Sequence, residues 1–391
     1  MVSTCSYCGN NPVPHRLTKI GTSISAYLRP PRHDSLLQCF SAKAAQRCLQ
    51  AVIGLFVLFG IARVTHDSKD ALSARGEVLW EEAKRRGIAM HGYRVFGRKT
   101  DAYRAKVKGR SILFNGMPRP LISKSGSEWW LDDKATLKKK LIAANIPVSR
   151  GGRVDDLSAA RSLFNSLEKP LVIKPAVGSR GRHTTTHIYT ERELENAYRI
   201  TKQLSRSCVL EEHLVGSVYR ATIIDGQLVG VLGGDPPRIV SDGVSTIAAL
   251  IERKNASRDP RISPVVLGES QLRFLLRLGY TSESILPPGM RIDVSEKIGI
   301  GYGGHSAEVT PTTHPETKRI LTKAAEVVAD PIIGFDFIIP DITKSPHEQR
   351  WGIIECNAVP FINLHHDPIE GTPVNVAKHV WDYVEAHIER F

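Results

Sequence analysis

A glycine-rich, basic turn is the first feature of the chain that could do chemistry. It runs from Lys174 to His183 (KPAVGSRGRH) and lies between two strand-like runs, 171–174 and 184–189. Because the turn joins two strands and opens no helix, it is neither a Walker A loop nor a GxGxxG fingerprint. Its backbone N–H groups can still fold over phosphate oxygens while Lys174 neutralises charge. The turn therefore indicates a phosphate-binding loop, and an ordinary solvated turn is the alternative.

Acidic and amide side chains occur on two strand-like runs near the C-terminus. Asp336 lies in the apolar run FDFII, and Glu355 and Asn357 lie two residues apart in the run IIECN. Residues two apart on a strand share a face, so Glu355 and Asn357 point the same way. Two carboxylates and an amide are the hard oxygen ligands that suit Mg²⁺ chelated by a nucleotide triphosphate, and Mn²⁺ accepts the same donors. A charge within an apolar run needs a compensating cation. These residues predict a divalent metal site, with acids that face solvent or pair with Arg as the alternative.

A third segment could recognise a nucleoside. The run 209–214 (VLEEHL) is predicted as a strand that enters a loop ahead of a hairpin. Backbone C=O and N–H groups at such a strand edge can pair with a purine, and an acid can bind ribose hydroxyls. The residues in this position are Glu211, Glu212, His213 and Leu214.

The elements that position these residues alternate between helix and strand, which favours an α/β fold. A helix is predicted at 73–86, and beyond it strand-like runs at 93–96 and 111–114. Asp225-Gly226 between two strand-like runs is a strong hairpin signal, so antiparallel pairing also enters the fold. Further helices are expected at 132–145, 157–167, 191–204, 315–329 and from Val374 onward.

Charge and composition set residues 1–64 apart from the rest of the chain. This segment holds seven Lys or Arg against one acid, and so carries +6 of the formal charge of +13. The remainder is only mildly basic and has neither clustered basic residues with interleaved aromatics nor a nucleic-acid-binding motif. We therefore expect no nucleic-acid partner.

The same segment contains a CxxC pair and a hydrophobic run. Cys5-x-x-Cys8 is half of a zinc site if His15 or His33 completes it, and a pair of free thiols otherwise. The run 48–62 is uncharged, but its fifteen residues reach only about 22 Å, short of a hydrocarbon core of roughly 30 Å. It is either a buried strand or helix, or part of a segment, 43–63, that associates with a membrane surface through its basic flanks. The scattered cysteines favour a reducing compartment, so we expect the cytoplasm, or the cytoplasmic face of a membrane.

Taken together, the motifs resemble the ATP-grasp superfamily of ligases, in particular the ATP-grasp domain of cyanophycin synthetase and of bifunctional glutathione synthetases. The resemblance covers about residues 130–385. It depends on seven runs in the family's order: 131–151, 171–188, 209–230, 242–261, 301–316, 334–342 and 351–377. The resemblance implies an ATP-grasp domain at 131–391 with a nucleotide lid at about 131–215 and a metal-binding subdomain at about 216–391. A small α/β domain at 65–130 and the basic appendage 1–64 would precede it.

The resemblance also assigns roles to residues. It implies that Lys134 and Lys174 reach the ATP phosphates, that Glu211 to Leu214 hold adenine and ribose, and that one or two Mg²⁺ ions bind the acids and amide described above. The phosphate loop would comprise Gly178, Ser179, Arg180, Gly181 and Arg182. Arg220 would approach the phosphates or the acyl substrate. The acceptor side would be lined by His305, Ser306, His365 and His366.

Two positions depart from the family pattern. The family commonly has a basic residue followed by Asn before its Gly-Gly pair, whereas this chain reads SEKIG at 295–299, so Lys297 is the candidate cation for the tetrahedral intermediate. Many members carry an acid where Val218 stands. The expected activity is an ATP- and Mg²⁺-dependent ligase that joins a small-molecule or peptide carboxylate to an amine through an acyl phosphate. The alternatives are a phosphotransferase on the same fold and a non-catalytic ATP-binding, membrane-tethered module.

Overall fold

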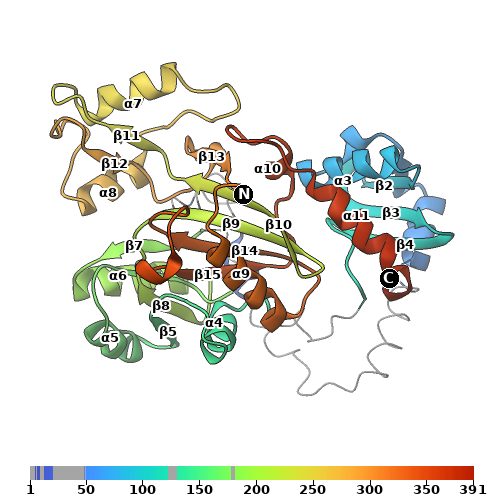
Figure 1. The fold of residues 1–391 in the computed structure, drawn as a ribbon, viewed down its shortest axis with the longest axis horizontal. Coiled ribbons are helices and arrows are strands. Elements are labelled where there is room, and N and C mark those ends of the chain that lie inside the picture. The colour runs from blue at the N-terminus through green and yellow to red at the C-terminus, as the bar shows by residue number, and fades with distance from the viewer. Residues whose placement is uncertain are drawn as a thin grey trace.

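The structure is a computed structural model that describes residues 5, 7, 8, 13–20, 48, 50–121, 130–177 and 181–391. Its strands form four separate groups. In Figure 1 a five-stranded sheet lies in the middle, with a sheet of four strands below it, a second sheet of four strands to its right, and a small two-stranded unit above it. The chain thus combines α-helices with antiparallel sheets, which confirms the predicted fold class.

The central sheet is antiparallel throughout and has the strand order β13-β10-β9-β14-β15. On β14, Phe335 and Phe337 are fully buried in the core with residues of two helices, while Asp336 between them points to the other face. The sheet therefore separates a hydrophobic core from a polar face. The elements of this unit are β9 (Ser217–Ile224), β10 (Gln227–Asp235), β13 (His305–Glu308), β14 (Ile332–Ile339), β15 (Gly352–Asn357), α4 (Lys134–Ala143) and α9 (Pro315–Val328).

The second sheet has the order β5-β8-β6-β7, again antiparallel. Phe164, Leu171, Ile173 and Leu194 belong to the core between this sheet and its helices. The turn between β6 and β7 is the glycine-rich turn, and its residues 178–180 lie outside the described residues. The elements are β5 (Gly151–Val154), β6 (Leu171–Pro175), β7 (Thr185–Ile188), β8 (Cys208–Glu212), α5 (Leu157–Ser166) and α6 (Glu191–Lys202).

The N-terminal sheet has the order β1-β2-β3-β4 and is closed by the last long helix of the chain. Trp381 and Val384 of that helix, α11, pack into the same core as Trp80 and Tyr103. The segment from β1 to β4 and the C-terminal helix are therefore parts of one folded unit. The elements are β1 (Ala62–Thr65), β2 (Ala89–Val95), β3 (Arg98–Val107), β4 (Arg110–Asn115), α3 (Ala74–Arg85) and α11 (Val376–Ala386).

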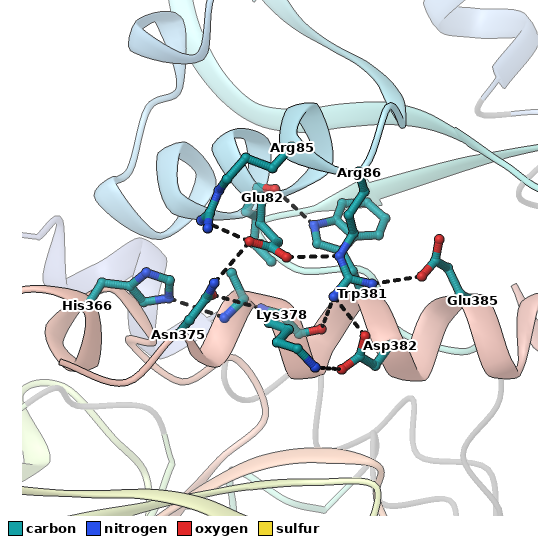
Figure 2. A network of polar contacts seen from close by, with 11 residues as sticks. Glu82, Arg85, Arg86, His366, Asn375, Lys378, Trp381, Asp382 and Glu385 are labelled. Atoms are coloured by element: carbon teal, nitrogen blue, oxygen red, sulfur yellow. Dashed lines mark hydrogen bonds and ion pairs between the residues drawn. The ribbon is translucent and has the colours of Figure 1, made fainter.

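Figure 2 shows the polar contacts that fasten α11 to α3. Arg86 lies 2.9 Å from Glu82 and 2.7 Å from both Asp382 and Glu385. Asn375 donates a hydrogen bond of 3.0 Å to the second oxygen of Glu82. Because Glu82 is buried, these contacts compensate its desolvation and fix the helices against each other.

The remaining elements lie around these three sheets. The two-stranded unit of β11 and β12 carries two helices that share its core. Residues 50–58 form a helix, and no helix in the described part of the chain is long and apolar enough to cross a membrane. The remaining elements are β11 (Arg238–Val240), β12 (Arg291–Asp293), α7 (Ile247–Ala256), α8 (Glu269–Arg277), α10 (Asn363–His366) and the 3₁₀ helices Ser68–Asp70, Ile300–Tyr302, Pro346–Glu348 and Ile388–Arg390.

Candidate active site

The three expected metal ligands lie together on the polar face of the central sheet. Asp336 is the cross-strand partner of Glu355 on β15 and of Arg220 on β9. Arg220 makes two parallel hydrogen bonds to the Asp336 carboxylate, at 2.6 and 2.8 Å. Asn357 donates its side-chain amide to the same carboxylate at 3.2 Å. Strand register therefore brings two acids, an amide and a guanidinium to one place.

A lysine from the first turn of α4 completes this group. Lys134 is buried, and its ammonium nitrogen lies 3.1 Å from Glu355 Oε1. Asp133 caps the helix by accepting hydrogen bonds from the N–H groups of Ala135 and Thr136, which fixes where α4 begins. Burial alone would raise the pKa of Glu355, but Lys134 and the other nearby cations hold it below its ordinary value. Glu355 is therefore an ionised carboxylate, as a metal ligand must be.

Lys174 connects the second sheet to the central one. It comes from β6, forms an ion pair with Glu211 on β8, and donates a hydrogen bond of 3.3 Å to the carbonyl of Ile354, next to Glu355. Lys138, one helical turn after Lys134, forms an ion pair with the other oxygen of Glu211. Burial would raise the pKa of Glu211, but the two lysines lower it to about 2.

Sequence reasoning missed Lys138. This lysine is buried and also donates hydrogen bonds to the carbonyl and the hydroxyl of Ser149, at 2.8 and 3.0 Å. Its spacing of four residues from Lys134 places both on one helix face, and that spacing was the available signal. Lys138 and Lys174 therefore share the Glu211 carboxylate, one on each oxygen.

The expected nucleoside edge is buried. Glu212 forms ion pairs with Arg350 and, at 3.4 Å, with Arg150, and it accepts a hydrogen bond of 3.1 Å from the N–H of Glu168. Burial and the neighbouring His187 lower the pKa of His213 to about 4, so its imidazole is neutral at pH 7. Leu214, which follows Glu212 and His213, is buried as well.

Lys297 contacts the glycine-rich turn at Gly181. The ammonium nitrogen of Lys297 donates a hydrogen bond of 2.5 Å to the carbonyl of Gly181. Arg182 Nε is buried and has no hydrogen-bond partner among the described residues. The calls on Gly178, Ser179 and Arg180 fall on residues outside the described ones. Lys297 and the glycine-rich turn therefore lie side by side.

Comparison with known proteins identifies the architecture. No family model matches the sequence. The chain is 30% identical over 362 residues to a cyanophycin synthetase from Trichormus variabilis, covering 88% of this chain and 39% of that protein. It is 30% identical over 252 residues to the glutathione biosynthesis bifunctional protein GshAB of Clostridium perfringens, covering 62% of this chain and 32% of that one. A crystal structure of a bifunctional glutathione synthetase from Pasteurella multocida matches with a TM-score of 0.52 and 22% identity over 79% of this chain and 43% of that one.

The chain resembles ATP-grasp ligases in sequence and has the ATP-grasp fold. Its fold agrees with that of the bifunctional glutathione synthetase, and its sequence relatives are ATP-grasp ligases that form carbon–nitrogen bonds. The chain spans well under half the length of the relatives given above.

On the expected acceptor side of this ATP-grasp domain, the four predicted residues differ in their surroundings. His305 is partly exposed and lies 3.3 Å from Glu370, while the hydroxyl of Ser306 is buried without a hydrogen-bond partner in the described structure. His365 is fully buried, and its two ring nitrogens contact Glu308 at 2.6 Å and Thr222 at 2.9 Å. The ring of His366 accepts a hydrogen bond of 3.2 Å from a backbone N–H at the start of α11, and burial lowers the pKa of His366 to about 4.

The polar face can hold a nucleotide phosphate chain together with a divalent cation. Four cations form ion pairs with three carboxylates here: Lys134 with Glu355, Lys138 and Lys174 with Glu211, and Arg220 with Asp336. The donor set of two carboxylates and one amide fits Mg²⁺ or Mn²⁺, and the lysines fit phosphate oxygens.

Proposed function

We propose that the chain is an ATP-dependent carboxylate–amine ligase that forms an amide or peptide bond through an acyl phosphate and releases ADP and phosphate. The observation that carries the proposal is the group of Lys134, Lys174 and Arg220 around the acids and amide of β14 and β15. Such a group supplies both halves of an ATP–metal site, cations for the phosphates and oxygens for the metal.

In this proposal each charge exchanges one partner for another when the nucleotide binds. Lys134 would pass from Glu355 to a phosphate oxygen, and Glu355, Asp336 and Asn357 would hold one or two Mg²⁺ ions. Lys174 has three N–H donors and uses two of them on described residues, Glu211 and Ile354, so a third can reach a phosphate oxygen. Exchange of one partner for another offsets the desolvation cost of these charges.

The remaining roles follow the same geometry. The segment from Glu211 to Leu214, at the end of the interior strand β8, would hold adenine and ribose, with its two carboxylates paired to cations. The loop of Gly178, Ser179, Arg180, Gly181 and Arg182 would fold over the phosphates. Lys297, attached to Gly181, would move with that loop. Bound Mg²⁺ would offset the negative charge that develops on the phosphate oxygens.

The chemistry follows from the poor reactivity of a carboxylate toward an amine, because its leaving group is oxide. A carboxylate oxygen attacks the γ-phosphorus, the bond to the bridging oxygen of ADP breaks, and an acyl phosphate forms. The amine nitrogen then attacks the acyl carbon, phosphate leaves, and the amine loses a proton. Arg220 would orient the phosphates or the acyl group, and Lys297 would stabilise the oxyanion of the tetrahedral intermediate. A closed loop would keep water from the acyl phosphate.

The substrates would be a small-molecule or peptide carboxylate and an amine. His305 and Ser306 are the residues that we place nearest the acceptor, since one is partly exposed and the other has a buried hydroxyl without a partner in the described structure. His365 and His366 would instead hold the acceptor side in place through their contacts with Glu308, Thr222 and the start of α11.

Product analysis over a panel of amino acids and short peptides tests the function. The purified chain is incubated with ATP, Mg²⁺ and each pair of compounds, and the products are identified by mass spectrometry. An amide formed together with one ADP per bond supports the ligase. A stable phosphorylated product would assign the chain to the phosphotransferases, and ATP binding without turnover across the panel would support the non-catalytic module.

We also propose that residues 43–63 attach the enzyme to a membrane surface. Residues 43–47 and 49 lie outside the described residues, but the helix 50–58 exposes Leu58 to 78%, and Phe59 beyond it is 72% exposed. Apolar side chains so exposed can enter the headgroup region of a bilayer. Cosedimentation with anionic vesicles should fall sharply in the Leu58→Ser, Phe59→Ser variant; equal binding of variant and parent would refute this location.

A further inference from the structure

Four side chains that can bind a metal, from two distant parts of the chain, meet at the end of the glycine-rich turn. Cys5, Cys8 and His15 belong to the N-terminal segment, and His183 is the last residue of the turn. Their ligand atoms all lie within 4.8 Å of one another. None of the four belongs to the proposed nucleotide or metal site on the central sheet.

Three of four separations between the ligand atoms match those of a tetrahedral zinc site, and the fourth is shorter. Zn–S bonds of about 2.3 Å and Zn–N bonds of about 2.0–2.1 Å at tetrahedral angles place sulfur and nitrogen about 3.6 Å apart and two nitrogens about 3.3 Å apart. The His183 Nε2 atom lies 3.6 Å from Cys5 Sγ and 3.5 Å from Cys8 Sγ. The Nε2 atoms of His183 and His15 are 3.3 Å apart, and Cys8 Sγ lies 3.1 Å from His15 Nε2. One ion can therefore reach all four atoms.

Neighbouring groups orient the ligands as they do in known zinc sites. The Nδ1 atom of His183 donates a hydrogen bond of 2.7 Å to the carbonyl of Ile200, which leaves the lone pair of Nε2 directed at the cluster. Thr201 donates a hydrogen bond of 2.9 Å to the carbonyl of His183. The N–H of Cys8 bonds to the carbonyl of Cys5 at 3.0 Å, so the CxxC pair is a tight turn with both sulfurs on one side. Cys8 and His183 are each only 1% exposed.

The surrounding contacts show where the N-terminal segment is attached. The N–H of His183 donates to the carbonyl of Tyr7 at 3.1 Å, and Arg273 on α8 donates to the Tyr7 hydroxyl at 2.6 Å. Lys19 donates a hydrogen bond of 2.8 Å to the carbonyl of Lys202 at the end of α6. These contacts join the described N-terminal residues to His183, α6 and α8, and a bound metal would strengthen this attachment.

We propose that Cys5, Cys8, His15 and His183 form a structural Cys₂His₂ zinc site. All four positions of a tetrahedral ion would be filled by protein atoms, which leaves no open position for catalysis. The ion would attach the N-terminal segment to the last residue of the glycine-rich turn. Because His183 has a left-handed backbone with φ of 52°, the ion would also hold that end of the turn in a conformation that is costly for a non-glycine residue.

Metal analysis of the purified full-length chain tests the site. The parent protein, prepared from zinc-supplemented cells and dialysed, should contain close to one zinc per chain. Cys8→Ser and His183→Ala should each lose most of this zinc, whereas Cys48→Ser, which changes an exposed cysteine outside the cluster, should retain it. Absence of stoichiometric zinc from the parent, stoichiometric iron in its place, or unchanged zinc in Cys8→Ser would overturn the proposal.

A second measurement remains informative if a variant does not fold. The native parent is treated with a chelator, and its thiols are then alkylated and mapped by mass spectrometry. Cys5 and Cys8 should react only after chelation, and added zinc should restore their protection. Replacement of zinc by Co²⁺ should give the thiolate charge-transfer absorption in the near ultraviolet. A disulfide between the two cysteines in freshly prepared protein, or alkylation that does not depend on chelation, would contradict the site.

Discussion

Replacing Lys174 with Met is the most informative single change in the proposed nucleotide site. The ammonium group of Lys174 lies where the second sheet meets the central sheet, between Glu211 and the carbonyl of Ile354. Met keeps most of the aliphatic stem and removes the charge. The change therefore tests two functions at once: support of the buried Glu211 carboxylate, and contact with ATP phosphates.

The structural cost can be worked out from Glu211. Its pKa falls to about 2 in the folded chain, and each tenfold change in an acid constant is worth about 1.4 kcal/mol. The net stabilisation of the ionised form, after the cost of burial, is thus roughly 3 kcal/mol, and the two lysines together contribute more than this because they also offset that cost. Loss of Lys174 alone should therefore destabilise the chain by at least about 1–2 kcal/mol. Loss of a charge-assisted phosphate contact adds about 1.5–3 kcal/mol, or ten- to a hundredfold, to the barrier for ADP formation.

A matched variant separates the two functions. Lys138→Met removes the other lysine that pairs with Glu211, so it should lower thermal stability by a similar amount while ADP formation stays near that of the parent. Lys139→Met, an exposed lysine on α4, is the control and should change neither property. ATP affinity is measured by titration and turnover by ADP release. Lys174→Met with both within about threefold of the parent would refute the phosphate assignment.

Three further changes test neighbouring features. Glu355→Gln should remove most Mg²⁺-dependent ADP formation with little change in thermal unfolding, because it deletes a ligand charge but little volume; turnover near the parent rate would mean that Glu355 holds no metal. His365→Ala should lower the unfolding free energy by about 2–3 kcal/mol, because buried Glu308 and Thr222 lose a hydrogen-bond partner; unchanged denaturant unfolding would argue against this pairing. The folded state depresses the pKa of Glu211, so its stabilisation is full above its ordinary pKa and is lost as the pH falls toward about 2; Glu211→Gln should therefore flatten the acid limb of the stability profile, and an unchanged limb would contradict the assignment.

Elements defined by short-range sequence patterns, such as a capped helix or a two-residue hairpin turn, were predicted correctly. The helix predicted at 73–86 is found at Ala74–Arg85, with Ser73 as its cap. The hairpin predicted at Asp225-Gly226 forms between β9 and β10, and both residues have the positive φ that a type I′ turn requires. The resemblance to ATP-grasp ligases anticipated the fold, because seven ordered runs are a far stronger signal than any one motif.

Features that depend on distant contacts could not be predicted in this way. Strand β3 (RKTDAYRAKV) is rich in charge and was missed, since its pairing with both β2 and β4 decides its conformation. Zinc ligation was considered with His15 or His33, while His183, which is 175 residues from Cys8, could not be named from spacing; His33 lies outside the described residues. The packing of α11 on α3 likewise joins segments far apart in the sequence, such as Trp381 and Leu79, which are 302 residues apart.

Hydroxylamine trapping tests the ligase most directly. The chain is incubated with ATP, Mg²⁺ and a carboxylate substrate, with hydroxylamine in place of the amine. An acyl phosphate would be captured as a hydroxamate, so we predict equal amounts of hydroxamate and ADP, both abolished in Glu355→Gln. ADP released without hydroxamate, or a stable phosphorylated compound that hydroxylamine does not cleave, would contradict the acyl phosphate and with it the proposed ligase.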